Sequence, residues 1–500
     1  MEDPDLNRSI RMLVAKTLCI RDLNAIKSSD ELTLFGLDSL SRYELADLLL
    51  ERFGFDPLQE MEDAPTIEKL VEAVAKQIEQ KTLTERLTLE PSNRPSTLHP
   101  VSKTSDIELA IDDLVPKSIS LIIGYDDDIS DHVVGAFQAG LNAFPHFAGR
   151  IQGELNPLQL IVESTDDGIP FEWGSSDSLT TKEWESVSSE HWTMDFLPSS
   201  ATISGGLVRS PLLAVKTTRL KDGGSVLGLF LSHMLVDGVG LGLFFLHCAA
   251  AHRDVPAPTP IHDRSMLASN LAGPAALPSW YRTDRNDESI REWDLAEKSK
   301  VCVFSIGDRD LPKRLTTDNS GPNAWYGLTS FLCHQLSRLS GLDTVAMWCD
   351  LRGSLSIPRT YSGNVGCYWH ERITEPDDGI AGLASRLRTN ASAGSSHVQA
   401  IYRAVKQRQL QGESVRWCGT EPNVLPVNLV PFSMEPLDLG VGKPRFLRNL
   451  TRNLHGLRIS RAPQRADFIV EVCLPNDLPH ALVSECCSQG LNANVLSMES

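Results

Sequence analysis

The stretch SVLGLFLSHMLVDGVGLGLFFLH, residues 225–247, sets the class of fold. It opens with an almost continuous apolar run typical of a buried strand, and it ends in a second apolar run that continues as a helix candidate to residue 252. Between the two runs, the chain delivers His233 to a turn that contains Asp237 and Gly238. A glycine there permits a backbone turn that a side chain would obstruct. Strand, turn and helix in direct succession predict a mixed α/β domain around this segment.

The same alternation extends over most of the chain. Strands are expected at residues 118–125, 211–220 and 466–474, and helices at 132–144 and 327–340. The region from about residue 101 onward is therefore predicted to be α/β.

The first 80 residues have a different pattern. Three amphipathic stretches, which begin at Leu6, Leu40 and Thr66, have helical spacing and predict a small bundle. Residues 81–100 are polar and interrupted by prolines, which is the composition of a linker. We therefore expect a helical domain at residues 1–80, a linker at 81–100 and an α/β region after it.

Composition excludes several classes of function. The 500 residues have a formal net charge of -18, so neither nucleic acid nor an anionic membrane is an expected partner, because both attract patches of Lys and Arg. No apolar stretch is long enough to span a bilayer, and the N-terminus does not resemble a signal peptide. The ten cysteines are scattered without metal-binding or redox spacing. We expect a soluble, cytoplasmic protein with reduced thiols and no metal.

Ser39 stands in LFGLDSLSRYEL, residues 34–45, directly before a predicted helix. The N-terminus of a helix has free N–H groups and positive partial charge, so a phosphodiester on this hydroxyl would be stabilised. Residues 1–80 hold 17 Asp and Glu against 9 Lys and Arg, which suits a basic partner enzyme. A serine in this position is otherwise most often a simple helix cap.

The surroundings of Ser39 resemble an acyl-carrier domain of polyketide-synthase type over roughly residues 8–78. The acidic three-helix pattern, the Leu-Phe pair before the turn and DAPTIEKL at residues 63–70 carry the resemblance. It implies that Ser39 carries 4'-phosphopantetheine, attached by a phosphopantetheinyl transferase, and that the thiol of this group holds an acyl chain as a thioester. A polyketide or fatty-acid synthase acting in trans is a further expected partner.

His233 has the chemistry that transfer of an acyl group from a thioester requires. One group must take the proton of the acceptor as its oxygen attacks, and an imidazole has a suitable pKa near neutrality. The thioester is already activated, so the chemistry requires neither an enzyme nucleophile nor a metal. The string His-x-x-x-Asp-Gly is short, and alone it more often marks a core histidine beside a loop carboxylate.

Four stretches in a fixed order strengthen the interpretation of His233 as a catalytic base. They are AFPHFAGR at residues 143–150, the strand pair and motif ending at Gly238, DLRGSLSIPRTYSGN at 350–364 and DLGVGKP at 438–444. Together they resemble the BAHD acyltransferases over about 400 residues. The resemblance implies a chloramphenicol-acetyltransferase-like topology of two lobes with a channel between them. We expect the lobes at residues 101–295 and 296–500, with the charged stretch at 288–300 as a candidate connection.

The same resemblance implies roles for single residues. His233 is the general base at the middle of the channel, and Asp237 and Gly238 complete its motif, Asp237 in a structural role. Asp438 is expected to pair with Arg352 and to hold a loop of the second lobe in place, unless it is simply a solvated loop acid.

Two positions depart from the family pattern or stay open. Leu439 and Val441 replace the Phe and Trp that the family usually has after Asp438, so the aromatic lining of that loop is absent. Asn428, in PVNLVPF at residues 426–432, is a candidate donor to the oxyanion, although it could equally be a turn residue.

These expectations define a multidomain α+β protein, expected to be a monomer. Its function would be to transfer a polyketide or fatty acyl group from a phosphopantetheine or CoA thioester to a hydroxyl or amine of a small secondary metabolite. A condensation domain of the peptide-synthetase type is an alternative, against which DLGVGKP argues. A non-catalytic carrier and docking protein is the other, and the two missing aromatic residues keep it open.

Overall fold

The structure is a computed structural model, and it falls into two compact units, residues 1–88 and 89–500. Apart from shorter pieces, it describes residues 4–18, 32–35, 66–72, 95–102, 106–110, 118–154, 159–186, 196–199, 210–253, 256–270, 299–307, 322–373, 379–391, 396–411, 424–430, 437–449, 456–462, 467–475 and 477–498. The predicted linker, residues 81–100, contains the boundary between the units.

The first unit contains helix α1 (Pro4–Thr17) and the short helix η1 (Leu32–Phe35), and residues 67–72 are also helical. Apolar side chains at helical spacing form its core, among them Ile10, Val14 and Leu70, which are fully buried. The helices expected to begin at Leu6 and Thr66 are therefore present. Most of the helix expected from Leu40 lies outside the described residues.

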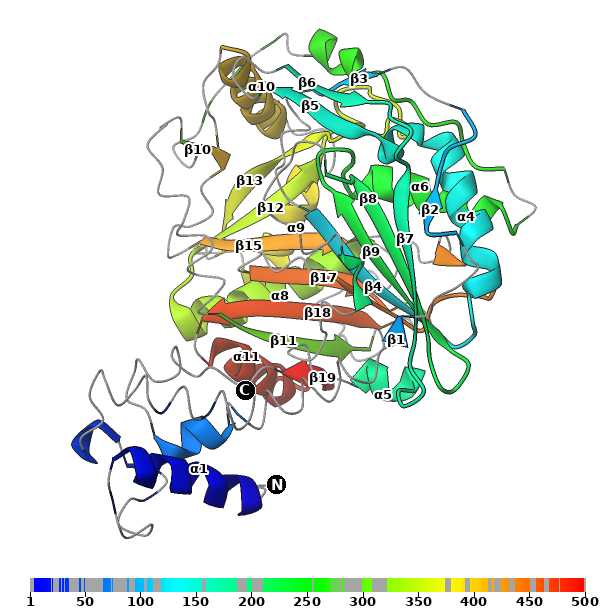
Figure 1. The fold of residues 1–500 in the computed structure, drawn as a ribbon. Coiled ribbons are helices and arrows are strands. Elements are labelled where there is room, and N and C mark those ends of the chain that lie inside the picture. Colours follow the sequence, from blue (N-terminus) through cyan, green and yellow to red (C-terminus); the bar gives the residue numbers. More distant parts are fainter. Residues whose placement is uncertain are drawn as a thin grey trace. The chain divides into compact units, whose positions relative to one another are not determined.

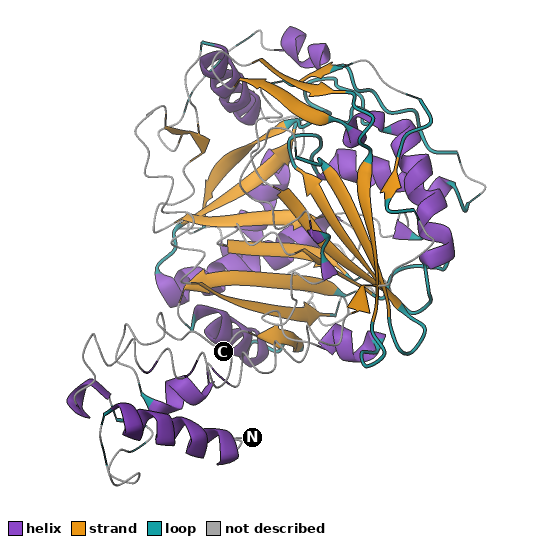
Figure 2. Cartoon of the chain, viewed as in Figure 1, coloured by secondary structure: helices purple, strands orange, loops and turns teal. Residues whose placement is uncertain are grey.

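The second unit is built on two large sheets (Figures 1 and 2). The first sheet has the order β7-β8-β9-β4-β16, and the short strands β1 and β2 lie at its β7 edge. Helices α4 (Ser130–Ala143) and α6 (Gly238–Ala250) lie against it. The strand bounds are β1 Thr88–Leu89, β2 Thr97–Leu98, β4 Ser118–Tyr125, β7 Ile169–Ser175, β8 Leu213–Arg219, β9 Ser225–Ser232 and β16 Phe446–Asn449.

Two of these elements follow directly from their composition. β4 is buried along almost its whole length, as its run of isoleucines and leucines predicts for a strand with both faces covered. α6 is apolar around most of its circumference, and Leu241, Phe244 and Cys248 are buried. The expected strands at 118–125 and 211–220 and the expected helices at 132–144 and 240–252 are confirmed.

The second sheet has the order β13-β12-β15-β17-β18-β11-β19, with β15 parallel to both of its neighbours. Its core packs against helices α8, α9, α10 and α11. The strand bounds are β11 Ser299–Ile306, β12 Thr344–Asp350, β13 Gly366–Arg372, β15 Val424–Val430, β17 Gly456–Arg461, β18 Phe468–Pro475 and β19 Ala493–Met498. The helix bounds are α8 Pro322–Ser340, α9 Gly379–Ala391, α10 Ser396–Leu410 and α11 Leu478–Ser488.

Smaller elements complete the unit. They are the strands β3 Ile107–Glu108, β5 Arg150–Glu154, β6 Gln159–Glu163, β10 Tyr281–Arg282 and β14 Arg416–Trp417, and the helices η3 Pro145–Ala148, α5 Thr181–Ser186 and η7 Arg264–Asn270. Among the described helices, none has the length and apolar character needed to cross a membrane.

The later part of the chain contributes one strand to the first sheet, so this sheet extends past the expected division at residues 295 and 296. β16 lies late in the sequence, but it pairs antiparallel with β4 at the edge of the first sheet. Sequence pattern missed it because a strand of four residues after Pro444 has too few positions for an alternation to be recognised. Most of the charged stretch at 288–300, expected to connect the lobes, lies outside the described residues, and its last two residues begin β11.

Candidate active site

His233 follows directly on the last residue of β9, Ser232, and stands in the turn before α6. The turn is short because Asp237 already caps the helix. The histidine is partly buried, while Met234, Leu235 and Val236 after it are fully buried. The apolar residues of the turn thus fix its backbone in the first lobe and leave His233 as the member with access to solvent.

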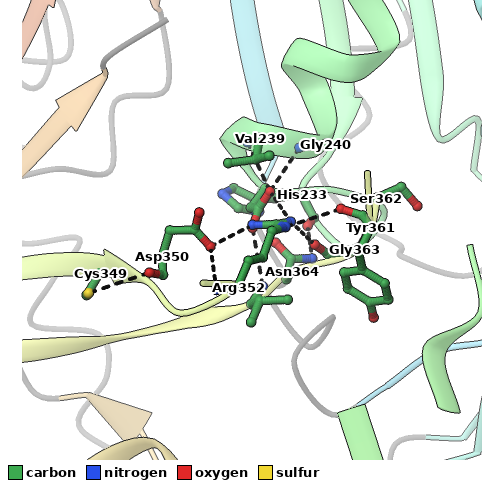
Figure 3. Close-up of polar contacts among 12 residues, drawn as sticks. His233, Val239, Gly240, Cys349, Asp350, Arg352, Tyr361, Ser362, Gly363 and Asn364 are labelled. Atoms are coloured by element: carbon green, nitrogen blue, oxygen red, sulfur yellow. Dashed lines mark hydrogen bonds and ion pairs between the residues drawn. The ribbon is translucent and has the colours of Figure 1, made fainter. Parts of the chain in front are cut away.

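Asp237 joins the first lobe to the second. Its carboxylate accepts hydrogen bonds from the backbone N–H groups of Val239 and Gly240, both at 3.0 Å, as an N-cap. It also accepts bonds from both terminal nitrogens of Arg352, at 2.8 and 2.9 Å, and from the N–H of Val365 at 3.2 Å. Figure 3 shows Arg352 reaching across to the start of α6. The carboxylate is therefore engaged in structure, the role expected of Asp237.

Arg352 is completely buried and surrounded by acceptors. Besides Asp237, it donates to Asp350 at 2.9 Å and to the carbonyl oxygens of Tyr361 and Gly363. Burial alone would lower the pKa of this guanidinium, but the two carboxylates outweigh burial, so its pKa is raised above the ordinary value. The arginine is a permanently charged link between the lobes.

The loop Tyr361–Asn364 holds the turn that carries His233. The side-chain amide of Asn364 donates to the backbone carbonyl of His233 at 3.0 Å, and Asn364 is only 1% exposed. Two residues before Asn364, the carbonyl oxygen of Ser362 lies where a Cβ on Gly240 would have to be, so only glycine fits at position 240. The resemblance marked this loop by its Tyr-x-Gly-Asn pattern, but the bond to His233 was not predicted.

Residues 261–264 make a second set of hydrogen bonds to the turn of His233 and to the loop Tyr361–Asn364. Arg264 donates to the carbonyl of Leu235 at 2.9 Å and to the hydroxyl of Ser362 at 3.2 Å. His262 bonds the same hydroxyl at 2.8 Å and the carbonyl of Ala143, also at 2.8 Å. Burial lowers the pKa of His262 to about 4, so it is neutral at neutral pH and can bridge two groups without adding charge.

The expected pair of Asp438 with Arg352 is wrong. Arg352 is held by Asp237 and Asp350, whereas the carboxylate of Asp438 accepts from the backbone N–H groups of Gly440 and Gly442 in its own loop. Both glycines have positive φ, 99° and 97°, which favours glycine and lets the loop fold back onto its first residue. Asp438 thus holds its own loop locally.

The remaining expected site residues are placed as follows. Gly238 is the first residue of α6, and Asn428 lies in the middle of β15 with Arg458 of β17 as its register partner. Asn428 is therefore a strand residue and not a turn residue, and its role as an oxyanion donor stays a prediction. Ser39 lies outside the described residues.

Nearby thiols are unsuited to nucleophilic attack. Cys349 precedes Asp350 in β12, and burial raises its pKa to about 12. Cys367 of β13 is 4% exposed and directs its thiol to the carbonyl of Val398. Since a thiolate is the reactive form of cysteine, these two residues are packing residues.

Comparison with known families supports the division of the chain. Residues 8–74 match the model of the phosphopantetheine attachment site, and residues 127–308 match the model of the Transferase family. The first match contains Ser39 and the second contains His233 and Asp237. The chain is therefore similar to a phosphopantetheine-attachment domain in its first part and to the Transferase family in residues 127–308.

Individual proteins agree with this assignment. Benzyl alcohol O-benzoyltransferase of Nicotiana tabacum is 26% identical over 211 residues, which is 40% of this chain and 41% of that protein. TRI101 of F. graminearum, in a crystal structure with coenzyme A and T-2 mycotoxin, has a TM-score of 0.60 at 16% identity and covers 79% of this chain and 100% of its own. Vinorine synthase has a TM-score of 0.58 at 18% identity, with coverage of 82% and 98%. The chain thus shares the fold of these structures and spans about two fifths of the Nicotiana enzyme.

Proposed function

We propose that this protein is an acyltransferase that moves an acyl group from a thioester to a small alcohol, with His233 as the general base. One observation carries the proposal: His233 is the partly exposed member of a turn that both lobes clamp, while the neighbouring Asp237 is fully engaged with Arg352 and α6. The imidazole is thereby left as the group of this motif that can exchange a proton with a substrate.

The reaction balances with this chain's own groups. A ring nitrogen of His233 takes the proton of the acceptor hydroxyl while the acceptor oxygen attacks the thioester carbonyl carbon. The carbon–sulfur bond then breaks, and the departing sulfur takes the proton from the imidazolium, which gives an ester and a free thiol. Asn428 is our candidate for stabilising the oxyanion, because it lies on the face of the second sheet opposite the hydrophobic core.

The donor thioester is proposed to come from the carrier domain, with acyl-CoA as the other source. When bound to Ser39, 4'-phosphopantetheine supplies a terminal thiol that can hold an acyl group. A linker of about 20 residues has a coil-like reach of roughly 25 Å, so a tethered donor would be present at an effective concentration on the order of millimolar. We further propose that a synthase or ligase loads the acyl group onto the carrier domain and that the acceptor is a small molecule.

The proposal is tested by release of free thiol from a panel of acyl-CoAs in the presence of alcohols and amines. We expect thiol release that depends on an alcohol and that falls at least 100-fold in His233→Gln. The matched control is His397→Gln, because His397 is an exposed histidine at the start of α10. Turnover with amines alone would indicate amide formation, and equal rates in His233→Gln and the wild type would overturn the general base.

A further inference from the structure

The second sheet has one face outside its hydrophobic core. In β12 and β13, alternate side chains belong to the core, namely Val345, Met347 and Cys349 in the first strand and Cys367 and Trp369 in the second. Because side chains alternate along a strand, Trp348, Tyr368 and His370 must lie on the opposite face. All three are partly exposed. We call this the inner face.

The inner face is turned toward the first lobe. Arg458 of β17 lies on it, since the core holds the flanking Leu457 and Ile459. The guanidinium of Arg458 donates to the carbonyl of Asn449, the last residue of β16 in the first sheet, at 3.2 Å. Asn428 is the register partner of Arg458, so the candidate oxyanion donor shares this face.

Trp348 and Tyr368 form an aromatic pair on the inner face. They are register partners in neighbouring strands, with ring centroids 5.2 Å apart at 72°. A Cβ on Gly366 would lie 2.6 Å from the indole of Trp348, so the glycine makes room for the ring to lie across β13. The indole therefore extends over Gly366, the first residue of β13.

Both strands of this pair lead to residues that hold the turn of His233. Trp348 is two residues before Asp350, which bonds Arg352, and Gly366 is two residues after Asn364, which bonds the carbonyl of His233. At about 3.3 Å per residue, two residues of strand span roughly 7 Å. The two rings therefore lie, along their strands, next to the residues that hold the turn of His233.

The chemistry of the pair suits an uncharged ligand. Burial lowers the pKa of the neighbouring His370 to about 4, so its imidazole is neutral at neutral pH and adds hydrogen-bonding capacity without charge. Half-exposed aromatic rings favour flat partners, which they meet by edge-to-face or offset contacts.

We propose that Trp348 and Tyr368 form a recognition wall for an uncharged aromatic or conjugated group of the substrate, supplied by either the acyl chain or the acceptor. The inference rests on the proposed acyl transfer, which it deepens by naming a substrate class. The two rings are specificity-determining residues and take no part in proton transfer.

The test compares flat and saturated ligands of similar size. Benzoyl-CoA and cyclohexanecarbonyl-CoA form the acyl arm, and benzyl alcohol and cyclohexylmethanol form the acceptor arm. For each, Kd is measured by equilibrium dialysis with the His233→Ala protein, alone and combined with Trp348→Leu or Tyr368→Leu. Trp325→Leu is the matched control, because Trp325 is partly exposed in the same lobe but packs against Phe468 at the core side of the sheet.

In one arm, we expect the flat ligand to have a lower Kd than its saturated counterpart. Trp348→Leu or Tyr368→Leu should reduce this ratio of Kd values about tenfold, and Trp325→Leu should leave it unchanged. The arm that responds identifies the source of the aromatic group. Unchanged Kd ratios in both arms, in variants with a wild-type urea midpoint, would overturn the wall. The proposed transfer is tested separately. If it failed, His233→Gln and the wild type would show the same turnover, and the Kd ratios of this binding test could still be measured.

Discussion

Asp237 of the first lobe and Arg352 of the second form a buried, two-pronged ion pair, with N–O distances of 2.8 and 2.9 Å. The side chains are 6% and 0% exposed. The acid of the His-x-x-x-Asp motif therefore fastens the lobes together next to His233, and the spacing of four residues lets one turn present a histidine and also anchor itself across the interface.

Removing the arginine is expected to destabilise the protein strongly. In Arg352→Met, the buried carboxylate of Asp237 loses its charge partner, and such losses typically cost about 3–5 kcal/mol. The urea midpoint of unfolding measures the effect. Arg445→Met is the matched control, since Arg445 pairs with Asp126 at 2.9 Å with both side chains partly exposed, and it should cost less than about 1 kcal/mol. Equal losses in the two variants would show that the buried pair has no special weight.

Asn364 is expected to act as a positioning residue. In Asn364→Ala the carbonyl of His233 loses its donor, so we expect kcat to fall by roughly 10- to 100-fold with little change in KM, because a small misplacement of the base affects the transition state most. Asn390→Ala, which removes a bond to Glu371 on the far side of β13, should leave kcat within about twofold. A change in KM alone would argue that Asn364 contacts substrate instead.

Acid should weaken the lobe interface through His262. Its folded pKa of about 4 lies below the ordinary value of 6.5, so the unfolded chain binds its proton more readily. This histidine therefore contributes its full stability above pH 6.5, and that contribution is lost as the pH falls from 6.5 to 4. Between pH 7.5 and pH 5 the loss should be about 2 kcal/mol in urea unfolding.

The matched comparison for this pH effect is between two glutamine variants. His262→Gln should flatten the dependence on pH, and His397→Gln on the exposed start of α10 should leave it as in the wild type. A slope that survives His262→Gln undiminished would assign the effect to other buried histidines, of which His146 also has its pKa lowered by burial and by the charge of its neighbours.

Much of the fold could be predicted because its signals are local. β4 and β9 are near-continuous apolar runs, α6 is an apolar helix, and the motif at His233 falls between a strand and a helix as expected. Interactions between distant segments were harder. Arg352 pairs with Asp237 and Asp350 instead of Asp438, and nothing in a single sequence shows that Asp438 is already satisfied by two N–H groups of its own loop.

The carrier domain leads to a prediction about the donor. If the tethered thioester is used, Ser39→Ala should abolish transfer from the loaded protein, because no group can then be attached, while turnover with added acyl-CoA keeps its His233 dependence. The readout is intact-protein mass beside thiol release. Suppose that Ser39→Ala, after the same loading treatment, transferred the acyl group at the wild-type rate. That result would contradict Ser39 as the attachment site.

The most direct test of the account is to load an acyl-pantetheine group onto Ser39 and to follow the intact-protein mass while alcohols and amines are added, with wild type and His233→Ala in parallel. We expect the acyl mass to disappear only when an acceptor is present and only when His233 is intact. An acyl mass that persists with every acceptor, or that disappears equally fast in His233→Ala, would contradict transfer from the carrier by a His233 base.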